Sequence, residues 1–187
     1  MAKAIILAAG YGTRLGSLTK NCPKPAIKIG GKSIISRIID NLQAAGITET
    51  IINLHYLPET IAEEVASRAL FFYEPILLGH EGTISALRGW IGEDDFFVIN
   101  GDTISNVNFD KMQRINDAQG SDKAIIALME EYRCCGTWLY PKEYFTEFDL
   151  RIIPYRQHNL VWHDTGTPER LEVARQYYES AKYGNTK

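Results

Sequence analysis

The feature that most constrains this chain is an apolar run near its start that stops abruptly at a loop rich in glycine. Residues 5–9 are all apolar, the run ends at Gly10, and the loop that follows contains Gly12. Such a run predicts a buried strand, and the two glycines let the backbone approach a ligand with its N–H groups exposed. The sequence therefore predicts a strand that leads into a phosphate-binding loop.

Two cations accompany this loop. Arg14 lies within it, and Lys24 is held between Pro23 and Pro25. Arginine offers a planar fork to phosphate oxygens, whereas lysine offers a compact point charge. The glycines alone are also typical of a plain strand-to-helix turn. The glycines together with both cations favour a triphosphate site.

The segment LAAGYGTRL followed by PKP resembles the signature of the sugar-1-phosphate nucleotidyltransferases, which couple an NTP to a sugar 1-phosphate and release pyrophosphate. The family includes glucose-1-phosphate thymidylyltransferases and mannose- or heptose-1-phosphate guanylyltransferases, and this chain resembles a short member. The resemblance implies that Arg14 and Lys24 are catalytic. It also implies a set of nucleotide-binding residues: Ala8, Ala9, Gly10, Gly12, Thr13, Arg14 and Lys24.

Apolar runs alternate with helical periods along the chain, which is typical of a mostly parallel sheet. Strands are expected over residues 3–9, 50–54, 70–73, 95–100 and 123–129. Helices are expected over residues 33–45, 58–70, 83–91, 109–118 and 167–183. The expected fold class is α/β, a three-layer Rossmann-like nucleotidyltransferase fold with a mixed, mostly parallel sheet and ligands at the carboxyl ends of the strands.

Length and charge limit the remaining possibilities. The 187 residues fit a single nucleotidyltransferase domain, with an NTP-binding half over residues 1–110 and a reduced acceptor-binding half with the C-terminal helix over residues 111–187. A net charge of −3 without a basic run argues against a nucleic-acid partner. No signal-peptide pattern or apolar run of membrane-spanning length is visible, so we expect a cytoplasmic protein with no membrane partner. A homodimer is compatible with the sequence.

Two acidic residues stand where a metal ion could bind. Asp102 directly follows the buried run FFVING, and Asp164 precedes the cap of the C-terminal helix. Mg²⁺ prefers one or two carboxylates together with phosphate oxygens and waters. Taken alone, Asp102 is equally typical of a turn after a strand, and Asp164 of a hydrogen-bonding loop residue before a helix. By resemblance, Asp102 matches the G-D motif of the family and Asp164 its W-x-D-x-G-T motif, both of which bind magnesium, so the expected cofactor is Mg²⁺. Asp102 is also expected to be catalytic and nucleotide-binding.

The implied chemistry needs no nucleophile or general base from the protein. The sugar phosphate attacks the α-phosphorus of the NTP in line while pyrophosphate leaves, so the protein positions the reactants and neutralises charge. Arg14 and Lys24 are expected to stabilise the β- and γ-phosphates. A Mg²⁺ ion on the two carboxylates is expected to draw the reactants together.

The stretch LLGHEGTISALRG resembles the base-reading loop of the family, which is commonly L-G-T-A-G-A. Gly79 and Gly82 match this pattern, and both are expected to bind the nucleotide. His80 replaces a small residue, and it is expected either to bond the base or ribose or to be an exposed loop histidine. Asn53, at the end of an expected strand, is a further expected residue of the nucleotide pocket.

The stretch GTWLY resembles the acceptor segment of the family, commonly S-A-G-I-Y, which implies acceptor binding by Gly136 and Thr137. Trp138 is open to two interpretations, stacking on the acceptor or packing in the core. Glu147 falls near a glutamate that binds sugar hydroxyls in relatives, although a surface helix residue is also compatible with its position.

The middle of the chain is shorter than the family pattern. Shortly after Glu131 the chain reaches CCGTW, where relatives insert a β-meander whose E-K-P lysine binds the phosphate of the sugar. This chain contains no E-K-P. Four basic residues could substitute for that lysine, and the sequence favours none of them: Arg133, Lys142, Arg151 and Arg156.

The sequence favours a Mg²⁺-dependent nucleotidyltransferase that makes an NDP-sugar from an NTP and a sugar 1-phosphate. One alternative is a cytidylyltransferase acting on phosphocholine or another small phospho-alcohol, which suits a trimmed acceptor half. Another is a non-catalytic NTP- or sugar-nucleotide-binding regulator, which would not need the full set of cations and carboxylates. A dinucleotide oxidoreductase is disfavoured because GYGTRLG is not G-x-G-x-x-G, and a molybdopterin guanylyltransferase lacks the PKP.

Overall fold

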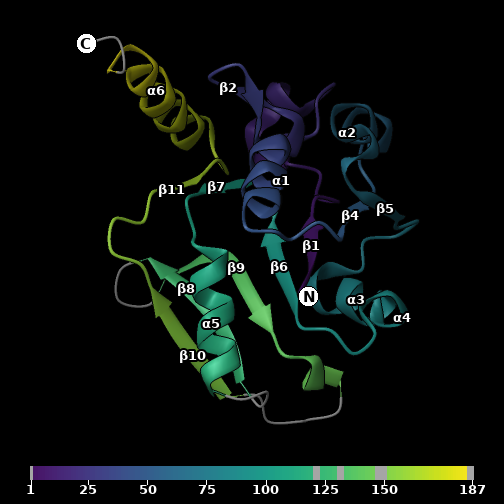
Figure 1. Ribbon diagram of the computed structural model, residues 1–187. Helices are drawn as coiled ribbons and strands as arrows, with labels where there is room; N and C mark the ends of the chain where they lie inside the picture. Colours follow the sequence, from purple (N-terminus) through teal and green to yellow (C-terminus); the bar gives the residue numbers. More distant parts are fainter. Residues whose placement is uncertain (1, 120–122, 130–132, 146–150, 185–187) are drawn as a thin grey trace.

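Seven strands form one sheet, and the computed structural model describes residues 2–119, 123–129, 133–145 and 151–184 of the chain (Figure 1). The strand order is β10-β8-β9-β6-β1-β4-β5. β9 is antiparallel to its neighbours β6 and β8, whereas all other neighbouring pairs are parallel. The strands are β1 (Lys3–Leu7), β4 (Thr50–Leu54), β5 (Leu70–Tyr73), β6 (Phe96–Asn100), β8 (Lys123–Met129), β9 (Arg133–Tyr140) and β10 (Arg151–Arg156). The predicted mixed, mostly parallel sheet is confirmed.

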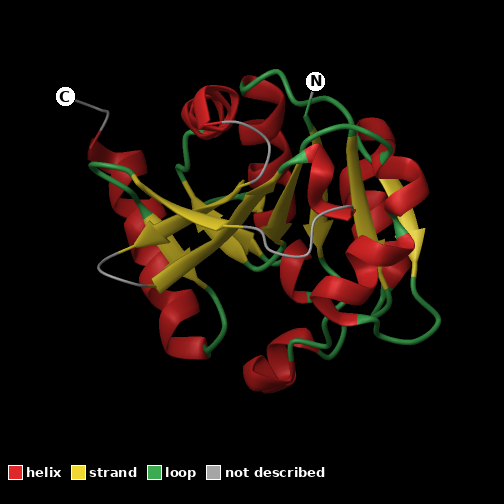
Figure 2. Cartoon of the chain, turned by 90° about the horizontal axis from the view of Figure 1, so that it is seen from below, coloured by secondary structure: helices red, strands yellow, loops and turns green. Residues whose placement is uncertain are grey.

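Helices cover both faces of the sheet, as the view from below shows (Figure 2). One face packs against α1 (Ile34–Ala44), α2 (Pro58–Val65), α5 (Phe109–Gln119) and α6 (Pro168–Gly184). The other face packs against α3 (Gly79–Ala86) and α4 (Arg88–Ile91). The three predicted layers are therefore present. Among the described residues, no helix combines the length and apolar character needed to cross a membrane.

Short elements complete the fold. Two small antiparallel ladders are made by β2 (Lys28–Ile29) with β3 (Lys32–Ser33), and by β7 (Thr103–Ser105) with β11 (Trp162–Asp164). The 3-10 helices are η1 (Thr13–Thr19), η2 (Lys24–Ala26), η3 (Ala66–Arg68) and η4 (Lys142–Phe145). The sequence did not predict the strands β2, β3, β7, β9, β10 and β11.

The helix α1 shows how local sequence sets an element. The Ser36 backbone N–H donates to Ser33 Oγ at 3.2 Å, which caps the helix. Five apolar side chains on one stripe are buried against the sheet, and they are Ile34, Ile35, Ile38, Ile39 and Leu42. The predicted span of residues 33–45 therefore matches the observed helix within one residue at each end.

Two helices differ from their predicted spans, and in both cases a tertiary contact explains the difference. The helix predicted over residues 58–70 ends at Val65, and the chain turns so that the Arg68 guanidinium reaches Asp40 Oδ1 at 2.9 Å on α1. The helix predicted over residues 83–91 begins earlier, at Gly79, after a buried Glu74 carboxylate accepts the N–H of Leu78. It is also divided into α3 and α4.

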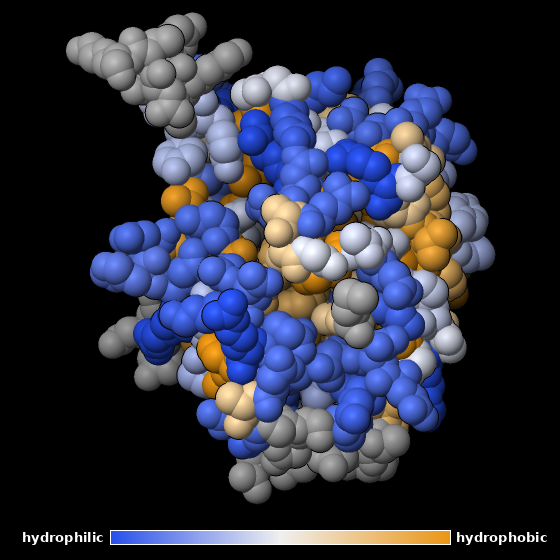
Figure 3. All heavy atoms as spheres, in the orientation of Figure 1, coloured by the Kyte–Doolittle hydropathy of each residue, from blue (hydrophilic) through white to orange (hydrophobic). Residues whose placement is uncertain are grey.

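The edge strand β5 exposes apolar side chains. Leu70, Phe71 and Tyr73 are 57%, 39% and 58% exposed. Figure 3 shows hydrophilic residues over most of this face of the molecule and apolar residues at its right-hand edge, where Figure 1 places β5. A homodimer nevertheless stays a prediction.

The three cysteines, Cys22, Cys134 and Cys135, are free thiols. Burial raises the pKa of the Cys135 thiol to about 12, and the negative charge of a neighbouring Cys134 thiolate would raise it further. Burial also raises the pKa of Cys22 and Cys134. The thiols are therefore protonated and unreactive at neutral pH.

Candidate active site

A hollow of about 250 Å³ lies at the carboxyl ends of β1 and β6. Its walls come from the glycine loop after β1, the PKP turn, the turn after β6 and the segment before α6. The lining residues are Leu7, Ala8, Gly10, Gly12, Thr13, Arg14, Lys24, Pro25, Asp102 and Gly166. The structure thus brings together the predicted phosphate-binding residues. Ala9 is buried and lies outside this lining.

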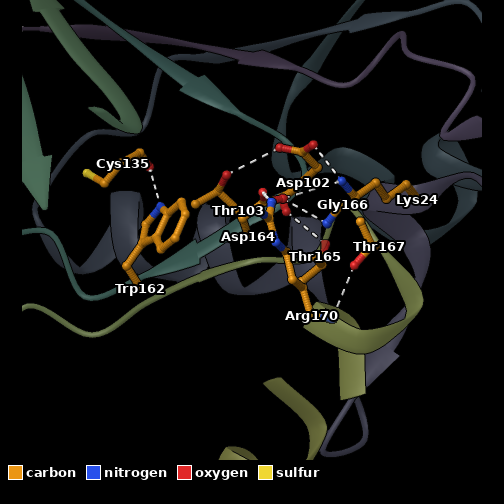
Figure 4. Close-up of polar contacts among 10 residues, drawn as sticks. All are labelled: Lys24, Asp102, Thr103, Cys135, Trp162, Asp164, Thr165, Gly166, Thr167 and Arg170. Atoms are coloured by element: carbon orange, nitrogen blue, oxygen red, sulfur yellow. Dashed lines mark hydrogen bonds and ion pairs between the residues drawn. The ribbon is translucent and has the colours of Figure 1, made fainter. Parts of the chain in front are cut away.

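Lys24 lies between the two carboxylates that the sequence singled out (Figure 4). Its side chain is 7% exposed, and its Nζ lies 2.6 Å from Asp102 Oδ2 and 3.9 Å from Asp164 Oδ1. The flanking Pro23 and Pro25 are buried as well, so the backbone that carries this ammonium is fixed. A positive charge is therefore held at the meeting point of Asp102 and Asp164.

Gly101 sets the position of Asp102. Its N–H donates to the Leu7 carbonyl at 2.8 Å, which ties the end of β6 to the start of the glycine loop. A Cβ on residue 101 would lie 2.8 Å from Leu7 O and 3.3 Å from the Cα of Ala8. Only glycine permits this approach of two backbones, and the approach places Asp102 next to Lys24.

The ladder of β7 and β11 brings Asp164 to the same place. Asp164 pairs with Thr103, the residue that follows Asp102. Thr165 Oγ1 donates to the carbonyl of Asp102 at 2.8 Å, which joins the two segments a second time. The two carboxylates, distant in sequence, are therefore held together by backbone pairing that the sequence did not reveal.

Arg14, on the glycine loop, lies close to the Asp164 carboxylate and lines the same hollow as Asp102. A Cβ on Gly166 would lie 3.1 Å from Arg14 Nη2 and 2.7 Å from Asp164 Oδ1, so all three groups are close neighbours. The Gly166 N–H donates to Asp164 Oδ1 at 2.7 Å. The guanidinium is thus available at the wall of the hollow, where its planar fork suits a phosphate.

The carboxylate pair fits a divalent cation that is shared with phosphates. The Lys24 ammonium already lies between Asp102 and Asp164, which shows that the geometry accommodates a positive charge there. The part of the chain that the structure describes holds no group of three or more His, Cys, Asp or Glu side chains that could bind a metal alone. Two carboxylates completed by phosphate oxygens and waters are the ligand set typical of Mg²⁺.

A buried acid that the sequence analysis missed supports the glycine loop. Glu74 is fully buried, and its carboxylate accepts from Asn53 Nδ2 at 2.9 Å, Thr83 Oγ1 at 2.5 Å and the Leu78 N–H at 3.1 Å. Asn53 Oδ1 in turn accepts the Ala8 N–H at 2.6 Å. Asn53, predicted to line the pocket, is therefore buried beneath the loop and holds its backbone. The sequence does place Glu74 directly after the apolar run LFFY, and this position at the end of a predicted strand was the signal that could have revealed its role.

The predicted base-reading residues lie on α3. Gly79 begins this helix and Gly82 lies within it, and neither lines the hollow. His80 is half-buried, with Nε2 at 3.2 Å from the Tyr140 hydroxyl and its ring edge-on to Trp138 at 4.7 Å between centroids. Burial lowers the pKa of His80. The interpretation of His80 as an exposed loop residue is therefore wrong.

The predicted acceptor residues are only partly placed near the carboxylates. A Cβ on Gly136 would lie 3.0 Å from Asn100 Nδ2 and 3.2 Å from Thr103 Oγ1, beside the turn that carries Asp102. Thr137 is 1% exposed, so its side chain belongs to the core. Glu147 lies outside the described residues.

Sheet topology separates the four basic candidates. Lys142 follows the end of the antiparallel β9, and its N–H donates to Asp95 Oδ1 at the edge opposite the hollow. Arg151 begins β10 and so belongs to that opposite edge too. Arg133 begins β9 and Arg156 ends β10, which places the backbones of both at the carboxyl edge of the parallel strands.

A further cation, Arg170, was not predicted. It lies in the first turn of α6, and its Nη1 makes a short ion pair with Asp164 Oδ2 (Figure 4). Leu171 and Ala174 on the same helix are buried, which fixes the backbone of this turn. No sequence signal distinguishes Arg170 from the other charged residues of this helix.

A larger hollow of about 540 Å³ lies at the opposite edge of the sheet. Its lining includes five acids, which are Glu93, Asp94, Asp95, Asp110 and Asp117. Acidic walls repel a polyanion. The smaller hollow, with Arg14 and Lys24 in its walls, is therefore the candidate phosphate site.

Comparisons with known proteins identify the family and the relatives that this chain resembles in sequence. The family described as nucleotidyl transferase matches residues 3–134. The mannose-1-phosphate guanyltransferase of Candida albicans is 34% identical over 134 residues, which cover 67% of this chain and 37% of that protein. The enzyme of the same name from Schizosaccharomyces pombe is 33% identical over 138 residues, which cover 69% and 38%. The chain thus spans little more than a third of the length of these relatives.

Solved structures share the fold over nearly the whole chain. HddC from Yersinia pseudotuberculosis has a TM-score of 0.77 and 23% identity, and the match covers 95% of this chain and 100% of that one. UDP-glucose pyrophosphorylase from Acinetobacter baumanii has a TM-score of 0.79 and 16% identity, with 95% and 93% covered. The predicted Rossmann-like nucleotidyltransferase fold is therefore confirmed.

Proposed function

We propose that this chain, which belongs to the nucleotidyl transferase family, joins an NTP to a sugar 1-phosphate and releases pyrophosphate, with Mg²⁺ as cofactor. One observation carries the proposal. The buried Lys24 ammonium lies between Asp102 and Asp164 in the wall of the glycine-loop hollow. Cations for phosphates and carboxylates for a metal thus meet at one point, as phosphoryl transfer requires.

The reaction needs one bond to form and one to break. An oxygen of the acceptor's phosphate attacks the α-phosphorus of the NTP, and the bond from that phosphorus to the β-bridging oxygen breaks, so pyrophosphate leaves with the electron pair. Arg14 and Lys24 are placed to stabilise the negative charge that grows on the leaving group. The acceptor is already an anion, so no side chain has to remove a proton.

Asp102 and Asp164 would hold the Mg²⁺ ion, which supplies charge neutralisation between the two reacting phosphates. The pairing of Thr165 with the backbone of Asp102 keeps the two carboxylates in register. The Glu74 network keeps the backbone at Ala8 in place beneath the nucleotide. These fixed groups hold the NTP so that the α-phosphorus faces the acceptor.

Guanine nucleotides are the first candidates for the NTP. The curated relatives compared above are named mannose-1-phosphate guanyltransferases, and HddC has been crystallised in complex with GMP-PN. We therefore propose GTP and mannose 1-phosphate as the first substrate pair to examine. The trimmed acceptor half keeps phosphocholine as the alternative acceptor.

The test is a pyrophosphate-release assay that crosses ATP, CTP, GTP, UTP and dTTP with a panel of sugar 1-phosphates and phospho-alcohols, with Mg²⁺ present. We expect release with one pair and a loss of about a hundredfold or more in Asp102→Asn. Asp110→Asn, an exposed acid in the opposite hollow, is the matched control. Release with CTP and phosphocholine would support the alternative acceptor. NTP binding without turnover across the panel would instead indicate a regulator.

A further inference from the structure

The two carboxylates are each neutralised by a different cation. Lys24 Nζ lies 2.6 Å from Asp102 Oδ2, and the Arg170 guanidinium pairs with Asp164 Oδ2. Figure 4 shows the two cations reaching the carboxylates from different sides. A divalent cation that binds both carboxylates must therefore compete with both positive charges.

The side chains of the two cations, Lys24 and Arg170, differ in how far they are exposed to solvent. The Lys24 side chain is 7% exposed, whereas that of Arg170 is 53% exposed. The backbone of Arg170 is held because the next residue, Leu171, is buried and the Arg170 N–H faces Thr167 Oγ1 at 3.4 Å. Arg170 thus carries an exposed guanidinium on a fixed backbone, so its departure from Asp164 would require no change in the fold.

The acceptor's phosphate needs a cation beyond those that serve the NTP. Arg14 and Lys24 line the nucleotide hollow, and a dianionic acceptor must be brought close to an already negative triphosphate. Arg170 belongs to the other half of the chain and touches the carboxylate on which the two substrates would converge. A guanidinium also binds phosphate oxygens in a bidentate manner.

We propose that Arg170 leaves Asp164 when a divalent cation binds there and then holds the phosphate of the acceptor. This inference rests on the proposed function. Before the metal binds, Arg170 neutralises Asp164. Afterwards the metal and Arg170 repel each other, and the phosphate dianion offers the guanidinium a new partner.

The test compares Arg170→Ala with Arg175→Ala in two measurements. Arg175 lies on the same helix and its Nη1 is 3.7 Å from Glu172, so the control removes the same charge and side chain away from Asp164. The first measurement is the affinity of the substrate-free protein for Mn²⁺, read by electron paramagnetic resonance. The second is the KM for each substrate in the pyrophosphate-release assay. Arg170→Lys tests whether a bare charge suffices.

We expect Arg170→Ala to bind Mn²⁺ about fivefold more tightly, since a competing cation is gone, while its KM for the acceptor rises about tenfold and its KM for the NTP changes little. Arg170→Lys should recover part of the acceptor affinity, and Arg175→Ala should match the wild type in both measurements.

Weaker Mn²⁺ binding by Arg170→Ala would overturn the inference, because Arg170 would then orient Asp164 for the metal. An unchanged KM for the acceptor would also overturn it. A wild-type protein that neither binds Mn²⁺ nor releases pyrophosphate would overturn the proposed function itself, which distinguishes the two failures.

Discussion

The two sides of the site, to which we assign the nucleotide and the acceptor, are built in different ways. On the nucleotide side, β1, the glycine loop and the PKP turn follow one another within the first residues of the chain, and buried groups such as Lys24 and Glu74 hold them. On the acceptor side, β7, β9, β11 and α6 meet through pairing between distant segments, and the exposed Arg170 completes the contact. One side is held by buried groups, whereas the other includes an exposed cation.

This structural difference suits the two different binding tasks that we propose for the two sides. A triphosphate binds best to donors that are already in place, because little reorganisation is then required. In the proposed reaction the acceptor side would have to accommodate a metal ion and a second anion in turn, and an exposed ion pair costs little to break.

Lys24→Met should damage the nucleotide side most. The buried ammonium is the partner of Asp102 at 2.6 Å, so its loss removes a cation from the phosphates and leaves Asp102 unpaired. We expect kcat/KM for the NTP to fall about 10²–10³-fold, measured by pyrophosphate release. Lys20→Met, at an exposed position nearby, should retain activity. Equal effects of both substitutions would contradict a special role for Lys24.

Gly101→Ala should destabilise the junction of β6 with the glycine loop. The new Cβ would lie 2.8 Å from Leu7 O, a backbone atom that cannot move without shifting β1. We expect the free energy of unfolding, measured in urea, to fall by about 1–3 kcal/mol, with NTP affinity reduced as Asp102 shifts. Gly89→Ala, where the Cβ meets no atom within 4 Å, should leave both quantities nearly unchanged. Comparable losses of stability in Gly101→Ala and Gly89→Ala would show that the contact of the new Cβ with Leu7 O is not the cause.

Gly136→Ala should affect the acceptor side alone. Its φ of 77° strains any side chain by about 1–2 kcal/mol, and the Cβ would press on Asn100 at 3.0 Å. We expect a loss of stability of that order and a raised KM for the acceptor, with NTP affinity retained. Gly31→Ala carries similar strain at φ 84° in open space, so it should lower stability without changing either KM. A raised KM for the NTP in Gly136→Ala would show that the two sides of the site do not act independently.

The smallest effect concerns pH. Burial lowers the pKa of His80 from 6.5, so the unfolded chain takes up a proton more readily than the folded one. Stability should therefore fall as pH drops below about 6.5, and His80→Asn should flatten part of this dependence. Burial lowers the pKa of His163 as well, so some dependence of the same sign should remain. The measurement is urea unfolding of the wild type and of His80→Asn between pH 7.5 and 5.5. An identical dependence of the free energy of unfolding on pH in the two proteins would contradict the role of His80.

Local signals explain what the sequence could predict. Ser33 and the isoleucine stripe fixed α1 almost to the residue, and the glycine loop with Lys24 indicated the phosphate site. The ladder of β7 and β11 involves three residues from each segment, too few for a periodic pattern. Glu74 and Arg170 act through partners far away in the chain, so their neighbours in the sequence do not reveal their roles.

We propose above all that Asp102 and Asp164 hold one divalent cation where the two sides of the site meet. The most direct measurement is the anomalous scattering of Mn²⁺ in crystals grown with a non-hydrolysable NTP analogue. We expect a peak bound by both carboxylates, with Lys24 turned toward the phosphates and Arg170 released from Asp164. A peak in the acidic hollow at the opposite edge, with none at Asp102 and Asp164, would show that these two carboxylates do not form the metal site.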